Sequence, residues 1–157
     1  MRISFWSIGK NHEPYVKAGV EDFSKRINNY FKLDWEIIAP LKNAAKMSID
    51  DIKKNEGDLI LSKIQKEDFL IALDERGTQL SSEGLAQQIQ LCANNSSKRV
   101  VFLIGGAFGI HEAVLNRANF KWSLSKLVFP HQLVRLILAE QVYRACTILK
   151  NEKYHHQ

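Results

Sequence analysis

Short apolar segments of strand length alternate with helical segments along this chain, and this alternation restricts the fold more than any other feature. The clearest strand is Val100–Ile104, in which every residue is apolar. Such a strand is usually covered on both faces, as in a parallel sheet. Further strands are predicted at Ile3–Ile8, Leu33–Ala39 and Phe69–Leu73. The alternation therefore predicts an α/β fold, a parallel sheet flanked by helices, in a single domain over residues 1–157.

Capping residues and apolar periodicity mark the helices between these strands. Pro14 suits the first position of a helix. One face of that helix carries apolar residues, namely Val16, Val20, Phe23 and Ile27. Ser48 predicts the capped start of a second helix that runs to about Ile64. Ser81 or Ser82 is expected to cap a third helix.

Composition excludes several classes of protein. With 45% apolar and 25% charged residues, the chain is globular rather than disordered. The net charge of +5 is compatible with a nucleic-acid partner and equally with an enzyme of a small metabolite. Cys92 and Cys146 are expected to be core thiols, and no set of side chains has metal-ligand spacing. No segment approaches membrane-spanning length, so a cytoplasmic protein with no membrane partner is expected.

Three segments at predicted strand ends are candidates for a binding site, because ligands of α/β sheets bind at the carboxyl ends of strands. They are Leu73–Gly77, Gly105–Gly109 and Ser123–His131. Within the first, Asp74–Gly77 is predicted to be a turn. The glycine-rich segment lacks the spacing of a dinucleotide fingerprint or a phosphate-binding loop. It is either a tight turn or a loop whose glycines let a ligand approach the backbone.

The last helix, His131–Leu149, is apolar nearly all round. A small domain covers one face of such a helix, so a second subunit is expected to cover another and the protein is expected to be a homodimer. His131 follows Pro130 and lies in the first helical turn, where the helix dipole favours a neutral imidazole. A neutral His131 can accept a proton, although a structural hydrogen bond is the commoner role of a single histidine.

Charged side chains interrupt this apolar helix and a polar tail follows it. Glu140 and Arg144 are four residues apart and can pair. Arg135 has no obvious local partner, which makes it the better candidate for a phosphate or substrate contact. Tyr154 and His155 combine stacking with proton transfer, which suits a nucleobase. An ordinary disordered terminus is the alternative interpretation of the tail.

Several short motifs, taken in order, resemble one protein family. They are Phe102–Gly106, Leu124–Lys126, Phe129–Arg135, Glu140–Ala145 and Tyr154–His155. Each is weakly specific alone, but together and in this order they resemble the SPOUT-class methyltransferases. More narrowly they are similar to the RlmH type, which methylates N3 of a pseudouridine in large-subunit ribosomal RNA. The resemblance covers essentially the whole chain.

The resemblance implies a trefoil knot at the C-terminus, an exception to the usual unknotted topology of proteins. It implies that S-adenosyl-L-methionine binds in the knot, held largely by backbone groups of three loops. Carried over to this chain, the cofactor-binding residues are Leu73, Gly105, Leu124, Ser125, Lys126, Leu127, Val128 and Phe129. It also implies a homodimer whose active site forms where the subunits meet, with the assembled ribosome as substrate.

The expected catalytic residues follow from the chemistry of that reaction. The N3 proton of the base must be removed, and His131 and His155 are the candidates for accepting it. Tyr154 is expected to stack on or position the base. Arg135 and Arg144 are expected to stabilise developing negative charge or bind backbone phosphate. The methyl donor is already activated by its positive charge, so no metal is expected.

The chain departs from the family pattern at two places, and rival functions remain open. Val128 stands where the family often has Thr, and His156 with Gln157 replaces a more usual basic ending. The rivals are a non-catalytic RNA-binding protein and a SPOUT methyltransferase that acts on transfer RNA or another ribosomal site. A third is an ordinary α/β enzyme of a small nucleotide.

Overall fold

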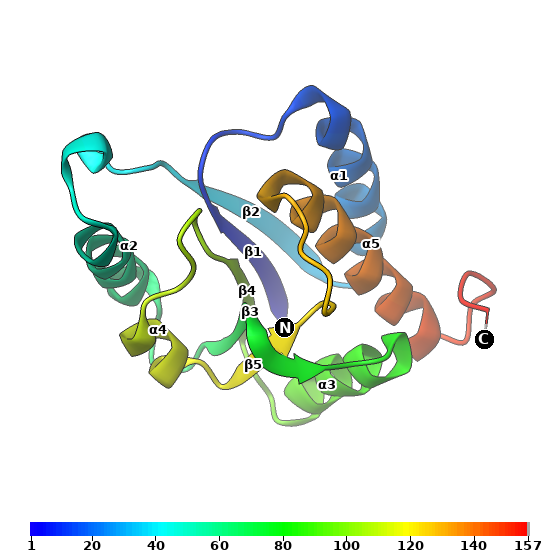
Figure 1. Cartoon of the computed structure of the whole chain (residues 1–157). Helices are drawn as coiled ribbons and strands as arrows, with labels where there is room; N and C mark the ends of the chain where they lie inside the picture. Colours follow the sequence, from blue (N-terminus) through cyan, green and yellow to red (C-terminus); the bar gives the residue numbers. More distant parts are fainter. Residues whose placement is uncertain (157) are drawn as a thin grey trace.

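The computed structural model describes residues 1–156 and has a five-stranded parallel sheet flanked by helices (Figure 1). The strands are β1 (Arg2–Ile8), β2 (Lys32–Ile38), β3 (Phe69–Gln79), β4 (Arg99–Ile104) and β5 (Phe120–Ser123), in the order β2-β1-β4-β3-β5. The helices are α1 (Pro14–Ile27), α2 (Ile49–Lys63), α3 (Ser82–Asn94), α4 (Glu112–Arg117) and α5 (His131–Leu149), with a short 3₁₀ turn η1 (Ala44–Lys46). The predicted α/β architecture is confirmed.

Both faces of the sheet are covered, as the apolar strands predicted. Helices α1, α3 and α5 pack on one face, and α2 and α4 pack on the other (Figure 1). Strand β4 supplies both cores: Phe102 points into the first, whereas Val101 and Leu103 point into the second. Every residue from Val100 to Leu103 is fully buried. A strand buried on both sides cannot alternate with polar residues, which explains its wholly apolar sequence.

The predicted helix starts are confirmed in their capping contacts. The Ser48 hydroxyl oxygen accepts a hydrogen bond from the backbone N–H of Asp51 at 3.1 Å, and the Ser81 hydroxyl accepts from Gly84 at 3.0 Å. Each bond satisfies one of the free N–H groups of a helix N-terminus. Helix α5 begins at His131, directly after Pro130.

The predicted turn at Asp74–Gly77 is wrong, because β3 continues through these residues to Gln79. Strand β5, which was not predicted, pairs with β3 on both sides of a bulge, and Trp122 is the partner of Leu73 and again of Thr78. Local Asp and Gly residues favour a turn, but pairing with a neighbouring strand keeps the segment extended. A Cβ on Gly77 would lie 2.6 Å from the Lys121 backbone, so the bulge packs directly onto β5.

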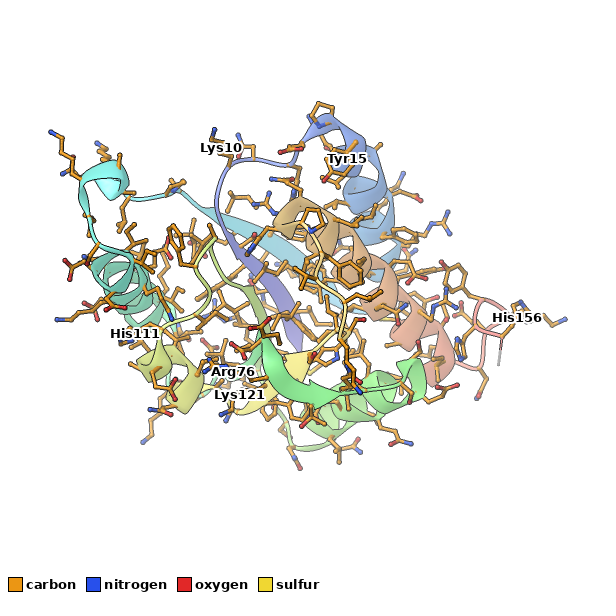
Figure 2. The ribbon with its side chains drawn as sticks, viewed as in Figure 1. Lys10, Tyr15, Arg76, His111, Lys121 and His156 are labelled. Carbon is orange, nitrogen blue, oxygen red and sulfur yellow. The ribbon has the colours of Figure 1, made fainter. Side chains whose placement is uncertain are left out.

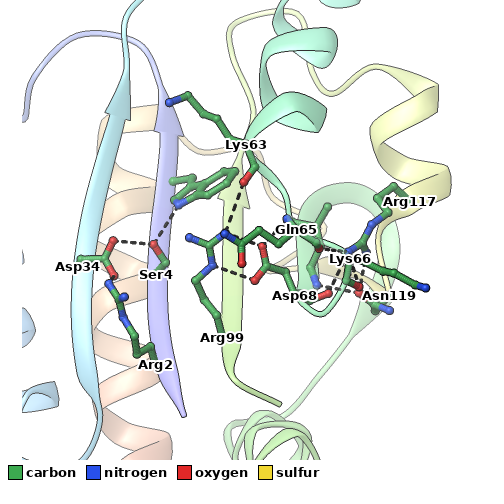
Figure 3. A network of polar contacts seen from close by, with 12 residues as sticks. Arg2, Ser4, Asp34, Lys63, Gln65, Lys66, Asp68, Arg99, Arg117 and Asn119 are labelled. Atoms are coloured by element: carbon green, nitrogen blue, oxygen red, sulfur yellow. Dashed lines mark hydrogen bonds and ion pairs between the residues drawn. The ribbon is translucent and has the colours of Figure 1, made fainter.

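A polar network holds the amino-terminal edge of the sheet together (Figure 3). Asp68, just before β3, accepts hydrogen bonds from Arg99 Nε at 2.9 Å and from the Gln65 backbone N–H at 2.8 Å. Arg117 at the end of α4 donates to the carbonyl oxygens of Gln65 and Asp68. Burial alone raises the pKa of the Asp68 carboxyl, but the bonds from Arg99 and Gln65 outweigh it and hold the pKa below its ordinary value.

We expect Asp68→Asn to lower the free energy of unfolding by about 2 kcal/mol at neutral pH, because Arg99 loses a charged partner that is itself buried. A depressed pKa stabilises the fold above the ordinary carboxyl value of about 3.9, and the benefit disappears as pH falls through the folded value. Urea unfolding at several pH values measures this. Asp22→Asn, which breaks an exposed pair with Arg26, should change stability by less than about 0.5 kcal/mol. Equal effects of the two variants would contradict the argument.

Candidate active site

A cavity of about 560 Å³ lies at the opposite, carboxyl edge of the sheet. Its walls come from the ends of β3, β4 and β5, which are neighbours because β3 lies between the other two. All three segments that the sequence suggested contribute to it, with Leu73, Gly105 and Leu124 among the lining residues. The volume is typical of a site for a small organic ligand.

Part of the cavity wall is apolar, and several exposed apolar side chains also border the cavity. Leu73, Ile104, Trp122, Leu124 and Val134 line the wall. Of these bordering side chains, Phe108 is 47%, Leu127 71% and Val128 87% exposed. Exposed apolar groups gathered around an opening are typical of a ligand or subunit contact. This arrangement fits a site that a ligand or a second subunit covers.

The glycine-rich turn forms one side of the cavity and is shaped by close packing. A Cβ on Gly105 would lie 2.6 Å from Cγ1 of Ile110, so no side chain fits there without movement. Gly109 has φ +89°, a left-handed conformation that favours glycine, and a Cβ added there would meet no atom within 4 Å. The segment is therefore a tight turn and also lines the cavity. The sequence had left open whether it was a tight turn or a loop that a ligand can approach, and the structure is compatible with both.

His131 borders the same cavity and is oriented by the glycine turn. Its Nδ1 lies 2.9 Å from the carbonyl oxygen of Gly105. A carbonyl oxygen only accepts, so Nδ1 must carry the proton. In the neutral ring, Nε2 then keeps a free lone pair. The structural hydrogen bond that the sequence suggested therefore also fixes the tautomer that can accept a proton at Nε2.

Acidic side chains from the β3 bulge also line the cavity. Asp74 and Glu75 both contribute, and Arg76 pairs with Asp74, its Nε lying 3.0 Å from the carboxylate. Burial alone raises the pKa of Asp74, but the hydrogen bonds from Arg76 hold the pKa below its ordinary value. The Asp74 side chain is only 9% exposed. A charged carboxylate thus stands in the cavity wall, and Arg76 balances its charge.

The C-terminal tail packs against the end of α5, away from Arg76 (Figure 2), and lines no part of the cavity. The Tyr154 ring lies 4.7 Å from that of Tyr143, and the Arg144 guanidinium lies 4.8 Å from the Tyr154 ring. The Tyr154 hydroxyl donates to Glu140 at 3.1 Å, and Arg144 pairs with Glu140 as predicted. Burial and the Glu140 charge raise the pKa of Tyr154, so its hydroxyl stays protonated.

Both ring nitrogens of His155 are engaged in this tail cluster. Arg144 Nη1 lies 3.2 Å from Nδ1, and Glu83 Oε1 lies 2.7 Å from Nε2. Guanidinium only donates, so Nδ1 accepts, and Nε2 carries the proton and donates to Glu83. A neutral His155 in this arrangement has no free lone pair. It can accept a proton only after it releases Arg144.

Arg135, for which the sequence showed no local partner, is buried inside the folded chain and has partners that are distant in sequence. Its side chain is 1% exposed. Nε donates to the Ser7 hydroxyl at 3.0 Å, and Nη1 donates to His12 Nδ1 at 3.3 Å. These partners precede it by more than a hundred residues, so no local spacing could have shown them. Burial and the nearby Arg135 charge lower the pKa of His12, which keeps that ring neutral and accepting.

The sequence matches a known family over almost its entire length. A family model described as "Predicted SPOUT methyltransferase" matches residues 1–155. The chain belongs to the SPOUT methyltransferase family. A Christiangramia forsetii protein named ribosomal RNA large subunit methyltransferase H is 46% identical over 157 residues, all of both chains. The protein of the same name from Cytophaga hutchinsonii is 45% identical, covering 99% of this chain and all of its own.

A solved structure shares the fold of this SPOUT methyltransferase at low sequence identity. It is a "probable methylase family protein" from Haemophilus influenzae, with a TM-score of 0.56 and 11% identity. The match covers 99% of this chain and 70% of the other. At that identity the likeness concerns the fold alone.

The predicted site residues of this SPOUT methyltransferase separate into three places. All the predicted cofactor-binding residues except Lys126 line the cavity, together with His131. Arg144, Tyr154 and His155 form the tail cluster, and Arg135 lies inside the protomer. His131 and Arg144 are thirteen residues apart on α5, which is about 20 Å along a helix. Gln157 lies outside the described residues, and His156 projects from the end of the tail (Figure 2).

The polar or aromatic groups that sequence reasoning missed at these places include Asp74, Glu75, Arg76, Trp122 and Glu83. Of these, Asp74, Glu75 and Arg76 lay in a segment that was singled out, and all three were interpreted as parts of a turn. Within residues 1–156, no three metal-ligating side chains gather. In the same range, no helix is sufficiently long and apolar to cross a membrane.

Proposed function

We propose that this chain methylates large-subunit ribosomal RNA at N3 of a pseudouridine, with S-adenosyl-L-methionine as methyl donor, in the assembled ribosome of the cytoplasm. The observation that carries the proposal is the full-length similarity to relatives named for large-subunit ribosomal RNA methylation. A trefoil knot at the C-terminal part belongs to the same proposal. The cavity, with a histidine on its wall that is oriented by the Gly105 carbonyl, supports it physically.

The cavity residues fit the proposed cofactor. When bound, S-adenosyl-L-methionine supplies a methyl group activated by a positively charged sulfur. The apolar wall around Leu73 and Leu124 suits an adenine ring, and backbone groups of Gly105 and of residues 124–129 are available at the cavity. Asp74 and Glu75 also lie at the cavity, where Asp74 is paired with Arg76. Nothing in this set requires a metal ion.

We assign the proton acceptor to His131 rather than to His155. The N3 proton of the base must leave before or as the methyl group arrives. In the neutral form of His131 the lone pair is on Nε2, because Nδ1 donates to the Gly105 carbonyl, and the residue borders the cavity. His155 has both nitrogens engaged by Arg144 and Glu83. His155 is therefore assigned to holding the tail in place, with Tyr154 as the stacking group.

A homodimer is the proposed functional unit. His131 begins α5, whereas Tyr154 packs on Tyr143 near the other end of that helix, so the two groups of one protomer cannot act on one base. The tail of a second copy would bring them together if the two α5 helices run in opposite directions. Leu133 and Ile137 of α5 are only partly buried in the protomer and offer an apolar contact for that helix. Arg135, being internal, is assigned to positioning the segment after β1 rather than to contacting RNA.

The cofactor cavity can be tested through Gly105. We expect Gly105→Ala to weaken S-adenosylmethionine binding by at least about tenfold, because the new Cβ collides with Ile110 and displaces the cavity wall. Isothermal titration calorimetry measures the affinity. Adding Ile110→Ala removes the colliding atom and should restore much of the binding, with Ile110→Ala alone as the matched control. Unchanged affinity in folded Gly105→Ala would refute the proposed cavity.

The function itself is tested by mass spectrometry of ribosomal RNA from cells with and without the gene. We expect one methylated pseudouridine to disappear from large-subunit RNA and to return when purified protein and S-adenosylmethionine are added to the ribosomes. Loss of a methyl group from transfer RNA instead would identify a different substrate. Absence of any binding of S-adenosylmethionine would favour a non-catalytic RNA-binding protein.

A further inference from the structure

Tyr15, in the first turn of α1, differs from the other three tyrosines of the chain because its ring is exposed and makes no contact. Tyr30 and Tyr154 donate hydrogen bonds to carboxylates, and Tyr143 packs among other aromatic rings. Tyr15 is 61% exposed and makes no ring contact or hydrogen bond within residues 1–156. A single exposed aromatic ring needs no explanation by itself, but the surroundings of this one point to a ligand.

Residues 9–13, which precede α1, are fastened to the start of α5. The side chain of Gln132 accepts a hydrogen bond from the backbone N–H of Glu13 at 2.9 Å and donates one to the carbonyl oxygen of Asn11 at 3.3 Å. Gln132 directly follows His131, the proposed proton acceptor. The first turn of α1 is therefore held beside the proposed active site, and a ligand that binds there does not have to order this backbone.

The loop 9–13 also carries positive charge that no ion pair neutralises. Lys10 is exposed, projects outward (Figure 2) and forms no ion pair within residues 1–156. Arg135 lies beneath the loop, since a Cβ on Gly9 would be 3.2 Å from its Nη2, and its bonded partners are a hydroxyl and an imidazole. Glu13 is the only acidic residue of the loop. Several cations at the amino-terminal edge of the sheet, by contrast, are paired with carboxylates. The loop therefore suits a phosphate group.

We propose that Tyr15 and Lys10 form a subsite for ribosomal RNA, in which the Tyr15 ring stacks on a nucleobase beside the target nucleotide and Lys10 pairs with a backbone phosphate. The inference rests on the proposed function. N3 lies on the pairing edge of the target base, so that base must be unpaired when it is methylated. An exposed aromatic ring beside a cation is the usual combination for holding unpaired nucleotides, because every base can stack on the ring.

This subsite stays accessible in the proposed dimer, because α1 and the second subunit contact different sides of α5. A Cβ on Gly19 of α1 would lie 2.6 Å from Cδ1 of Leu136, so α1 packs on that side of α5. The proposed subunit contact uses Leu133 and Ile137. Successive residues of a helix are turned by about 100°, which separates these two from Leu136. A second copy on their side leaves Tyr15 exposed.

The first test measures methylation of ribosomes purified from cells without the gene. Tyr15→Ala should lower kcat/KM by at least about fivefold, the lower end for the loss of one stacked base. Tyr15→Phe keeps the ring and should stay within about twofold of wild type, because stacking does not use the hydroxyl. Both variants should keep the Tm and the affinity for S-adenosylhomocysteine, because Tyr15 contributes to neither the core nor the cavity. Equal kcat/KM of Tyr15→Ala and wild type overturns the proposal, while the proposed function survives. If the wild-type protein methylates no ribosomal RNA, the proposed function fails and the subsite fails with it.

The second test measures how kcat/KM depends on salt. Lys10→Ala should make the slope of log kcat/KM against log salt concentration shallower by about 0.7 to 0.9, the value for one phosphate contact. Lys10→Arg keeps the charge and should keep the slope. The matched control is Lys66→Ala, which removes an exposed lysine at the opposite, amino-terminal edge of the sheet (Figure 3) and should also keep the slope. Equal slopes of Lys10→Ala and Lys66→Ala would contradict the phosphate contact.

The third test identifies the partner of Tyr15 directly. The full-length chain with the photoreactive residue p-benzoylphenylalanine in place of Tyr15 is irradiated together with the ribosomes. We expect crosslinks to large-subunit RNA at nucleotides that adjoin the methylated pseudouridine, and none there when the photoreactive residue replaces Lys66. Crosslinks only to a ribosomal protein, or only between two copies of this chain, would assign Tyr15 to a protein contact and overturn the proposal.

Discussion

Replacing His131 by Asn should lower the single-turnover rate of ribosome methylation by about 100-fold or more, the usual contribution of a general base. The amide nitrogen of Asn overlaps the position of His Nδ1 and can still donate to the Gly105 carbonyl. The glycine turn and the cofactor affinity should therefore survive within about threefold. The His131→Asn variant loses the Nε2 atom, which is the proposed proton acceptor at the cavity. The residual rate should rise with pH, because hydroxide then removes the N3 proton.

The matched control is His131→Gln, whose amide reaches the position of Nε2 but leaves the Gly105 carbonyl without its donor. That variant should lose both cofactor affinity and rate, whereas the Asn variant should lose rate alone. His156→Ala, at the exposed end of the tail, should leave both unchanged. A His131→Asn enzyme with wild-type rate would move the proton transfer to another group.

The cavity illustrates how much of a site can be predicted from a sequence. Ligands bind at the carboxyl ends of parallel strands, and Leu73, Gly105 and Leu124 follow three apolar or partly apolar segments. Which strand ends are neighbours depends on strand order, and β3 meets both β4 and β5 only in the folded chain. Strand β5, a four-residue edge strand, was not predicted, so the sequence could not show that Trp122 lies beside Leu73 at the cavity.

Polar contacts were predictable only where the partners are close in the chain. Glu140 and Arg144 are one helical turn apart, and their pairing is confirmed. Arg135 and His155 have partners that are far away in sequence, Ser7 and Glu83. A charge in an apolar helix signals that a partner exists, but not whether the partner is substrate or protein. The Arg135 side chain is buried and bonded to Ser7 and His12, so its partners are protein groups.

Removing residues 154–157 should reduce methylation of ribosomes by at least about 100-fold, with cofactor affinity within about threefold of wild type. The cavity contains no residue of the tail, which is why binding should survive. The tail supplies the Tyr154 ring, and stacking on a base is worth about 1–3 kcal/mol in related interfaces. Loss of both the ring and the His155 contacts should exceed the effect of either alone.

The contacts of the tail also set the expected loss of stability. Tyr154 packs on Tyr143 and binds Glu140, so truncation should lower the free energy of unfolding by about 2 kcal/mol.

Two point variants separate the packing of the tail from its role in the reaction. Tyr154→Phe keeps the ring and loses only the bond to Glu140, so methylation should fall less than fivefold. His155→Ala should lower the rate by a factor that Glu83→Gln partly reproduces, because both loosen the same contact.

The proposed dimer adds a complementation experiment to this truncation. Mixing the truncated chain with a full-length His131→Asn chain should form heterodimers in which one site has both an intact His131 and an intact tail from the other subunit. Activity should then recover to about half that of a wild-type dimer in those heterodimers, although each parent is inactive. Recovery requires that the tail acts across the interface. If the mixture stays as inactive as its parents, each tail serves its own protomer, and the separation of His131 from Tyr154 along α5 must be closed by movement within one chain.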